Sequence, residues 1–304
     1  MHRKHPGTDN RAEEIIPAVR RAARTLRRIN ADSSIKGSVD MAPIRVAVIG
    51  ASGRVGHEVV KAVCLDPETQ LVGAVESKTP VDYLVLPDGF RTVPFSSDLE
   101  QIILRCHPEV LVDFTVAPVT VPAAMIALKH KVNLVIGTTG LKQDEMTQID
   151  NLAKEQGVGV VLAPNFALGA IIMTHLSKIA AKYFDYAEII ELHHHLKVDA
   201  PSGTSIKTAM AIAEGRNGKP AGHMPEQKDT ESRGKMVNGV PIHSVRLPGI
   251  LARQEVRFGT AGQTLSIIHD TTSRECYMPG VLLAIKEVIN RKGLIFGLDT
   301  LLGL

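Results

Sequence analysis

The chain has 304 residues, of which 44% are hydrophobic and 22% are charged, and its formal net charge is +3 at pH 7. This composition is typical of a globular protein, and the length is enough for two domains of ordinary size. Residues 1–40 carry nine Lys and Arg against five Asp and Glu, a net of +4, so the remaining 264 residues carry +3 minus +4, or −1. A near-neutral body without Trp argues against a protein that binds nucleic acid.

The cysteines and the apolar residues indicate where the protein works. Cys64, Cys106 and Cys276 are widely spaced and form no CxxC pair. This pattern favours free thiols in a reducing compartment, and we expect a cytoplasmic protein. The sequence has no run of about 18 apolar residues, so it predicts neither a membrane span nor a membrane partner.

Residues 1–40 read as a leader, which we expect to be disordered. The segment from Ile15 to Ile29 could form a basic helix, and a linker follows from Ala31 to Asp40. The leader lacks the apolar core of a secretory signal, and its acidic residues are unusual for a transit peptide. An arm that binds a partner is the alternative, and Met41 offers a later start for the chain.

The first predicted domain, residues 41–168, opens with a dinucleotide-binding pattern. A β-branched strand over 44–49 enters a turn, Gly50-Ala51-Ser52-Gly53-Arg54-Val55-Gly56, and a helix follows over 54–64. A second strand over 71–75 ends in Glu76. In such units glycines let the backbone approach the pyrophosphate, the helix start stabilises its charge, and the acidic residue binds the ribose. The spacing is GxxGxxG, with Ser52 at the usual second glycine, and a turn without a ligand is the alternative.

Strands and helices alternate through the rest of this domain. Strands at 110–115, 133–137 and 159–163 are separated by helices at 118–130 and 143–156, which predicts an α/β fold with a Rossmann-like, doubly wound parallel sheet. The segments at the ends of these strands are Asp113-Phe114-Thr115, Gly137-Thr138-Thr139-Gly140 and Ala163-Pro164-Asn165-Phe166. Ligands bind at the carboxyl ends of such strands. Each segment alone could be a turn, but together we expect them to line one rim.

A second predicted domain, residues 169–272, has an α+β pattern. Helices are expected over 167–184 and 204–214, with a strand near 187–190 between them and a polar loop over 215–241. Strands at 243–247, 252–258 and 263–270 then alternate in polarity without intervening helices, which predicts a mainly antiparallel sheet with one covered face. The exposed face could pair with other copies. We expect residues 273–304, with a helix over 277–291, to return to the first domain.

The stretch from Glu191 to Thr204 concentrates the chemistry of the chain. Its sequence, ELHHHLKVDAPSGT, places three imidazoles, an ammonium and two carboxylates within fourteen residues. A strand-end His can act as an acid or a base near neutral pH, and Lys197 can donate a proton or pair with an anion. The segment from Pro201 to Thr204 reads as a turn that opens a helix, which suits a bound carboxylate. The stretch therefore predicts a pocket for a small dianionic substrate.

A metal site and a solvated loop are the alternatives for this stretch. On a strand, His193 and His195 would share one face, so a site with two His ligands is conceivable. No HExxH motif or cysteine pair supplies further ligands, and we expect no metal.

These residues together resemble the 4-hydroxy-tetrahydrodipicolinate reductase family, formerly called dihydrodipicolinate reductase, of the diaminopimelate route to lysine. The resemblance covers about residues 44–304, and Glu191 to Thr204 matches the motif E-x-H-H-x-x-K-x-D-x-P-S-G-T at every fixed position. It implies a homotetramer that uses NADH or NADPH to reduce (2S,4S)-4-hydroxy-2,3,4,5-tetrahydrodipicolinate, a small dicarboxylate, to (S)-2,3,4,5-tetrahydrodipicolinate with loss of water. Hydride would add at ring carbon C4.

The resemblance also implies roles for individual residues. His193 would be the acid/base and Lys197 the proton donor, and the substrate carboxylates would be held by His194, Gly203 and Thr204. The residues implied to contact the cofactor are Gly50, Ala51, Ser52, Gly53, Arg54, Val55, Glu76, Gly137, Thr138, Thr139, Ala163, Pro164, Asn165 and Phe166.

Some features depart from the family pattern. Some members have Arg directly after the Glu of the second strand, whereas Ser77 and Lys78 follow Glu76 here, so the choice between NADH and NADPH stays open. Val116 stands where members often have a charged residue, and residues 247–262 lack a common G-x-H element. Another two-domain dehydrogenase would need a different second-domain constellation, such as a Cys nucleophile. A non-catalytic relative would be expected to have lost His193 or Lys197.

Overall fold

The structure is a computed structural model that describes residues 42–79, 81–219, 222 and 231–304. The predicted leader, with its helix and its linker, lies outside these residues, as does part of the loop expected over 215–241. Within the described ranges, no helix combines the length and the apolar character needed to cross a membrane.

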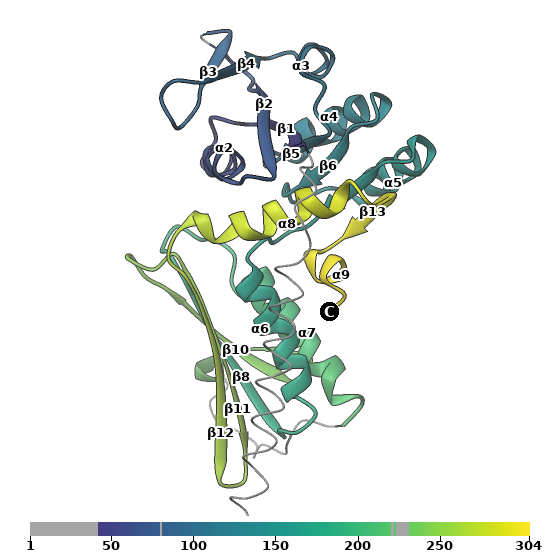
Figure 1. Ribbon diagram of the computed structural model, residues 1–304. Coiled ribbons are helices and arrows are strands. Elements are labelled where there is room, and N and C mark those ends of the chain that lie inside the picture. Colours follow the sequence, from purple (N-terminus) through teal and green to yellow (C-terminus); the bar gives the residue numbers. More distant parts are fainter. Residues whose placement is uncertain (1–41, 80, 220–221, 223–230) are drawn as a thin grey trace, which may run out of the picture. The chain divides into compact units, whose positions relative to one another are not determined.

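The first sheet has eight strands in the order β13-β7-β6-β5-β1-β2-β4-β3 (Figure 1). Every pairing in it is parallel except the one between β3 and β4. Its strands are β1 (Ile44–Ile49), β2 (Thr69–Val75), β3 (Tyr83–Val85), β4 (Thr92–Ser96), β5 (Val110–Asp113), β6 (Asn133–Ile136), β7 (Gly159–Leu162) and β13 (Gly293–Phe296). The prediction of a Rossmann-like sheet is confirmed.

Helices cover both faces of this sheet. On one face lie α2 (Gly56–Leu65) and α8 (Met278–Val288), and on the other α3 (Leu99–Cys106), α4 (Ala117–Lys129) and α5 (Gln143–Gln156). Successive residues of β1 enter the two cores in turn: Val46 and Val48 pack with α2 and α8, and Ala47 and Ile49 pack with the other three helices. This alternation explains why the parallel strands read as continuous apolar runs.

The order of strands in the first sheet sets the position of a ligand crevice. The chain passes from β1 to β2 on one side, then returns to place β5 on the other side of β1. The carboxyl ends of β1 and β5 therefore flank a topological switch point, where ligands bind in folds of this kind.

The second sheet has five strands in the order β12-β11-β8-β10-β9. They are β8 (Tyr186–His193), β9 (Lys235–Val237), β10 (Val240–Arg246), β11 (Ala252–Thr260) and β12 (Gln263–Thr271). The pair β8–β10 is parallel and the other pairs are antiparallel, so the sheet is mainly antiparallel, as predicted. Helices α6 (Leu168–Ala180) and α7 (Gly203–Arg216) pack on one face of the sheet, around Ile189, Ile212 and Phe258.

Several short elements were not predicted. The interval between Glu76 and Val110 holds β3, β4 and α3, and the chain continues past α8 into β13 and α9 (Leu298–Leu302). The short helices η1 (Glu231–Arg233) and η2 (Arg274–Tyr277) complete the fold. The expected loop over 215–241 contains η1, β9 and the start of β10, so this prediction was wrong at its end. Strands of three or four residues carry too little periodicity to be read from sequence.

Candidate active site

The glycine-rich turn after β1 has contacts that exclude side chains. Gly50 has φ 75°, and an added Cβ there would lie 2.7 Å from Cγ2 of Thr115. At Gly56 an added Cβ would lie 2.0 Å from the carbonyl oxygen of Gly50. These two glycines are thus required by the turn itself, which brings the end of β1 against the segment after β5.

The same turn presents backbone hydrogen-bond donors at the start of α2. In the described part of the chain, the backbone N–H groups of Arg54, Val55 and Gly56 at the start of α2 donate to no acceptor. Glu76, at the end of β2, accepts a hydrogen bond from the Ser52 N–H at 3.2 Å. A helix start with free N–H groups binds phosphate, and an acidic residue beside it suits a ribose hydroxyl. The turn therefore fits a dinucleotide.

A buried network joins the carboxyl ends of β5 and β6. Oδ1 of Asp113 accepts hydrogen bonds from the Thr115 N–H at 2.7 Å, the Thr115 hydroxyl at 2.6 Å and the Thr138 hydroxyl at 3.3 Å. The Thr120 hydroxyl, from α4, donates to that of Thr138 at 2.9 Å. The two strand ends therefore lie together, and the side chain of Thr138 is held within the network.

Aromatic packing accounts for two other residues of this rim. The Phe114 ring lies against Gly137, where an added Cβ would be 2.0 Å from its Cε1 atom. Phe114 also packs on Phe166, with ring centroids 5.3 Å apart, and Phe166 is buried in the core. The side chain of Asn165 accepts a hydrogen bond from the Ala167 N–H at 2.9 Å. Ala163 is also buried, whereas Thr139 and Pro164 are exposed.

The start of α7 forms an open anion-binding surface. Ser202 caps the helix, because its hydroxyl accepts a hydrogen bond from the Ser205 N–H at 3.2 Å. No acceptor within the described ranges pairs with the N–H groups of Gly203 and Thr204 or with the Thr204 hydroxyl. An added Cβ at Gly203 would meet no atom within 4 Å. Packing therefore does not require this glycine, and the space before it is free for a ligand.

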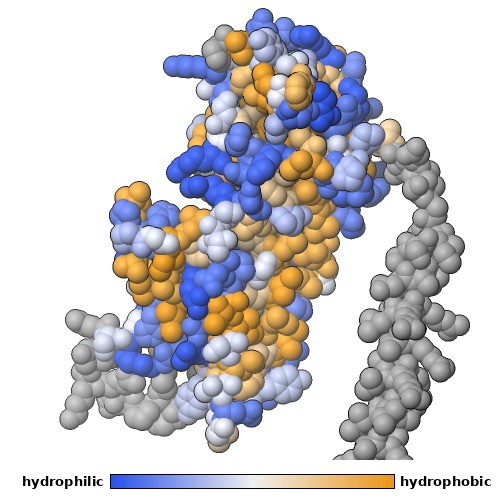
Figure 2. Space-filling model, turned by 60° about the vertical axis from the view of Figure 1, so that its left-hand side comes forward, coloured by the Kyte–Doolittle hydropathy of each residue, from blue (hydrophilic) through white to orange (hydrophobic). Residues whose placement is uncertain are grey.

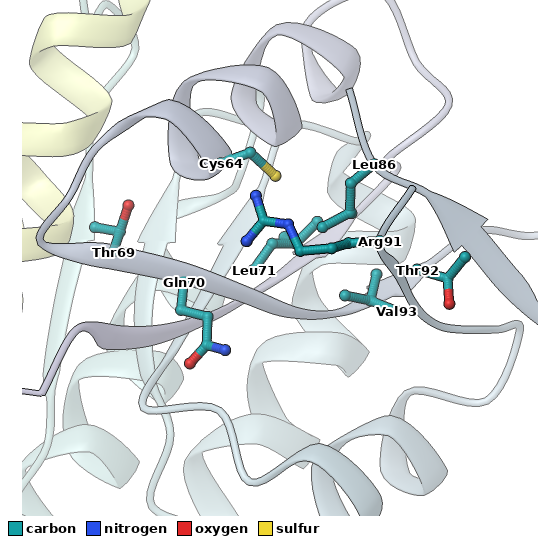
Figure 3. Close-up of a pocket in the computed structure, with 8 residues that line it drawn as sticks. All are labelled: Cys64, Thr69, Gln70, Leu71, Leu86, Arg91, Thr92 and Val93. Carbon is teal, nitrogen blue, oxygen red and sulfur yellow. The ribbon is translucent and has the colours of Figure 1, made fainter. Parts of the chain in front are cut away.

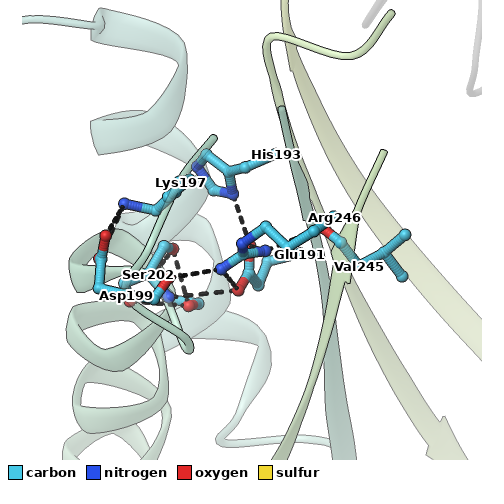
Figure 4. A network of polar contacts seen from close by, with 8 residues as sticks. Glu191, His193, Lys197, Asp199, Ser202, Val245 and Arg246 are labelled. Carbon is cyan, nitrogen blue, oxygen red and sulfur yellow. Dashed lines mark hydrogen bonds and ion pairs between the residues drawn. The ribbon is translucent and has the colours of Figure 1, made fainter. Parts of the chain in front are cut away.

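Glu191 lies beneath this surface and organises it (Figure 4). Its fully buried carboxylate accepts hydrogen bonds from Nδ1 of His193 at 2.5 Å, from Arg246 at 2.9 and 3.0 Å, and from the Ser202 N–H at 3.3 Å. Burial alone would raise the pKa of Glu191, but hydrogen bonds from His193, Arg246 and Ser244 lower it to about 2. The carboxylate is therefore charged at neutral pH.

Lys197 lies in the loop between β8 and α7. Its Nζ atom contacts both carboxylate oxygens of Asp199, at 2.7 and 2.8 Å, and its N–H donates to the His194 carbonyl at 3.1 Å. The hydrogen bond from Lys197 lowers the pKa of Asp199. Strand β8 ends at His193, so His193 and His195 do not share a strand face. Among the residues that the structure describes, no three His, Cys, Asp or Glu side chains are placed to hold a metal.

The predicted residues thus fall into two groups, one around the ends of β1, β2, β5, β6 and β7 and one around the end of β8. Sequence reasoning missed Arg246 and Thr120. Arg246 is 55 residues from Glu191, and the spacing of the sequence gives no sign that they meet. The signal that was present is the alternation of Ala187, Ile189 and Glu191, which places a carboxylate on the buried face of β8, where it needs a cation or several donors.

A cavity of about 250 Å³ lies elsewhere, at the amino end of β2 (Figure 3). Its lining residues are Cys64, Thr69, Gln70, Leu71, Leu86, Arg91, Thr92 and Val93. The Arg91 guanidinium is paired with Asp88 at 2.5 Å, and burial raises the pKa of the Cys64 thiol. Because Thr69 begins β2, this cavity lies at the opposite end of the strand from the candidate site.

Comparisons with known proteins cover nearly all of the described residues. A family model described as dihydrodipicolinate reductase, N-terminus, matches residues 44–166, and one described as dihydrodipicolinate reductase, C-terminus, matches residues 169–302. A protein of Dehalococcoides mccartyi named 4-hydroxy-tetrahydrodipicolinate reductase is 53% identical over 87% of this chain and 100% of its own length. A protein of the same name from Moorella thermoacetica is 46% identical, over 86% and 99%.

Solved structures are also similar to this chain. Dipicolinate-bound dihydrodipicolinate reductase from Paenisporosarcina sp. TG-14 superposes with a TM-score of 0.75 at 40% identity, over 85% of this chain and 99% of that one. An amine dehydrogenase from Mycobacterium smegmatis has a TM-score of 0.58 at 16% identity, over 83% and 94%. At that identity it shares the fold alone.

Proposed function

Because the chain belongs to the dihydrodipicolinate reductase family, we propose that it reduces 4-hydroxy-tetrahydrodipicolinate to tetrahydrodipicolinate with loss of water, in lysine and diaminopimelate biosynthesis. The reductant is NAD(P)H, and the protein is an oxidoreductase. The observation that carries the proposal is the start of α7, where Gly203 faces open space and two backbone N–H groups have no acceptor among the described residues. This surface suits a dicarboxylate.

We assign substrate binding to the end of β8 and the start of α7. The N–H groups of Gly203 and Thr204 and the Thr204 hydroxyl would donate hydrogen bonds to one carboxylate, with His194 beside them. Lys197 is held nearby by an exposed carboxylate, Asp199, which a substrate carboxylate can replace. A cation and helix-start amides together bind a dianion more strongly than either alone.

Proton transfer is assigned to His193 and Lys197. When bound, the nicotinamide supplies the hydride, which adds at C4 of the conjugated ring. The ring then takes up a proton at C5, the carbon beside the imine carbon, and we assign its delivery to Nζ of Lys197. Nε2 of His193 would take the acid/base role, because Nδ1 is hydrogen-bonded to Glu191.

The cofactor is assigned to the rim of the first sheet. Gly50 to Val55 would hold the pyrophosphate at the start of α2, and Glu76 would bind the adenosine ribose. Thr139 and Pro164, exposed at the ends of β6 and β7, would face the nicotinamide, with Gly137, Thr138, Ala163, Asn165 and Phe166 supporting them. Glu76 favours the free ribose of NADH and Lys78 could pair with the 2′-phosphate of NADPH, so both are candidates.

Three domain assignments and a homotetramer complete the proposal. Residues 41–168 would bind the dinucleotide, 169–272 would bind substrate and form the oligomer, and 273–304 would return to the first part. Apolar side chains are exposed beside charged ones over the second part of the molecule (Figure 2). On the face of the second sheet that lies away from α6 and α7 they include Val245 and Ile268, which are 37% and 48% exposed. Contact between copies through this face would bury these apolar side chains. We also propose that the enzyme is cytoplasmic, in agreement with its free cysteines.

Isotope transfer tests this reaction directly. With nucleotide that carries deuterium at the transferable position of C4, the tetrahydrodipicolinate formed should contain one deuterium at ring carbon C4, as seen by NMR and mass spectrometry. Oxidation of the nucleotide without deuterium in the ring would contradict the proposal.

A further inference from the structure

A buried ion pair lies behind the proposed acid/base, and we infer that Glu191 and Arg246 are positioning residues that fix which nitrogen of His193 faces the substrate. Neither residue is placed to touch the substrate in the proposal above, so both would act through His193. The kinetic consequences of this inference rest on the proposed function. The tautomer of His193 does not depend on it.

Glu191 is a charged group in the core of the second sheet. It lies on the inner face of β8, two residues after Ile189, which is also fully buried. A carboxylate in such surroundings persists only when donors surround it. Here the donors are the imidazole of His193, the guanidinium of Arg246, the N–H of Ser202 at the cap of α7 and the side chain of Ser244 on β10.

The charge on Glu191 determines the tautomer of His193. An ionised carboxylate has no hydrogen and can only accept, so the 2.5 Å contact requires a hydrogen on Nδ1 of His193. The neutral imidazole then carries its lone pair on Nε2. Among the described residues Nε2 has no hydrogen-bond partner, so it is free to take a proton from the substrate or from water and to return it.

Arg246 keeps the carboxylate of Glu191 ionised. Its NH1 and NH2 groups bind the two carboxylate oxygens of Glu191, and NH2 also donates to the Asp199 carbonyl at 2.7 Å. The guanidinium therefore neutralises the buried charge and ties down the loop that carries Lys197. Without Arg246, the buried negative charge of Glu191 would lack its cationic partner, and the carboxylate would tend to take up a proton. A protonated Glu191 can donate to Nδ1, which would place the hydrogen of His193 on Nε2.

A purely structural role for the pair predicts a different outcome. If the two residues only hold the start of α7, their loss would weaken dicarboxylate binding and stability together. A positioning role predicts that the tautomer of His193 changes and that kcat falls while KM for the dicarboxylate stays nearly constant.

The test compares Glu191→Gln and Arg246→Lys with wild type by nitrogen NMR of the imidazoles, with His193 assigned from a His193→Gln variant. We expect the Nδ1–H tautomer for neutral His193 in wild type and a substantial share of the Nε2–H tautomer in Glu191→Gln. In the family's reaction, kcat should fall about 100-fold in Glu191→Gln, with KM within about threefold. Arg246→Lys keeps the charge but loses the bidentate contact, and its kcat should fall about tenfold.

Glu100→Gln is the matched control. Glu100 also pairs with an imidazole, that of His130 at 2.8 Å, but on the outer helices of the first sheet. This variant should keep wild-type kcat and leave His193 unchanged.

Two outcomes would overturn the inference. One is an Nε2–H tautomer of neutral His193 in wild type. The other is an unchanged His193 spectrum together with kcat within about threefold of wild type in whichever of the two variants folds. Because NMR needs no substrate, a wild-type enzyme that fails to turn over would refute the proposed function without affecting this test.

Discussion

Nζ of Lys197 lies 2.7 Å from one carboxylate oxygen of Asp199 and 2.8 Å from the other. Both residues belong to the loop between β8 and α7, and the side chain of Lys197 is 21% exposed whereas that of Asp199 is 64% exposed. An ion pair with an exposed partner contributes about 1 kcal/mol or less, so a substrate carboxylate can replace Asp199 at little cost. In the proposed substrate site, this pair would hold Lys197 until a substrate carboxylate replaces Asp199.

Replacing Lys197 with Met tests its assigned role. Met keeps the apolar stem but removes the ammonium, so we expect kcat to fall about 100-fold because the proton donor is lost. Dinucleotide affinity, measured by fluorescence titration, should stay within about twofold of wild type. Lys178→Met is the control, since it breaks only the exposed Lys178–Glu214 pair. Equal losses of turnover and dinucleotide affinity would mean that Lys197 is structural.

Gly203→Ala tests the open surface at the start of α7. The added methyl group meets no protein atom within 4 Å, so the melting temperature should not fall. It would occupy the space before the free N–H groups, and we expect KM for the dicarboxylate to rise about tenfold or more. Gly259→Ala, on β11, also adds a methyl group in open space and serves as the control. An unchanged KM in Gly203→Ala would place the substrate elsewhere.

The buried carboxylate of Glu191 predicts a pH dependence of stability. Its pKa falls from an ordinary value of 4.5 to about 2 in the folded protein. The stabilisation is therefore fully present above pH 4.5 and is lost as the pH falls toward 2. From pH 5 to pH 3 this group should contribute a loss of about 2 kcal/mol in the free energy of unfolding.

Urea unfolding at the two pH values measures this loss. Glu191→Gln, although less stable at neutral pH, should lose less stability than wild type over the same interval, by about 2 kcal/mol. The same slope in both proteins would show that Glu191 is not the group responsible.

Glu76→Ala tests the ribose assignment. The Glu76 carboxylate lies beside the Ser52 N–H at the glycine-rich turn, where it would accept a hydrogen bond from a free ribose hydroxyl. Its removal should raise KM for NADH about tenfold and raise KM for NADPH less, because the repulsion of a 2′-phosphate disappears. Steady-state kinetics with both nucleotides give the ratio. A larger loss with NADPH would contradict the assignment.

Ile268→Glu tests the proposed contact between copies. The residue lies on the face of the second sheet that points away from α6 and α7, and it pairs with Glu255 of β11. A buried, unpaired carboxylate there would oppose association, so light scattering should show tetramers for wild type and smaller species for the variant. If Ile268 faces only solvent, the protein would tolerate the change. A variant with the same molecular mass in solution as wild type would therefore refute the proposed interface.

The parts of the fold that could be predicted from sequence are the local ones. Gly50 and Gly56 flank a turn after a β-branched strand, and each contributes to a pattern that spans few residues. Thr120 and Arg246 join the candidate site through contacts between elements distant in sequence, and no periodicity encodes such contacts. Strand β13 was not predicted for the same reason, because its pairing with β7 brings together residues more than 100 positions apart.

Turnover in a coupled assay tests the central claim most directly. Dihydrodipicolinate synthase would generate the unstable substrate in place, and absorbance at the nicotinamide band would be followed with NADH and NADPH in parallel. We predict substrate-dependent oxidation of at least one nucleotide by wild type and almost none by His193→Gln or Lys197→Met. No oxidation of either nucleotide by folded protein that still binds dinucleotide would contradict the assignment.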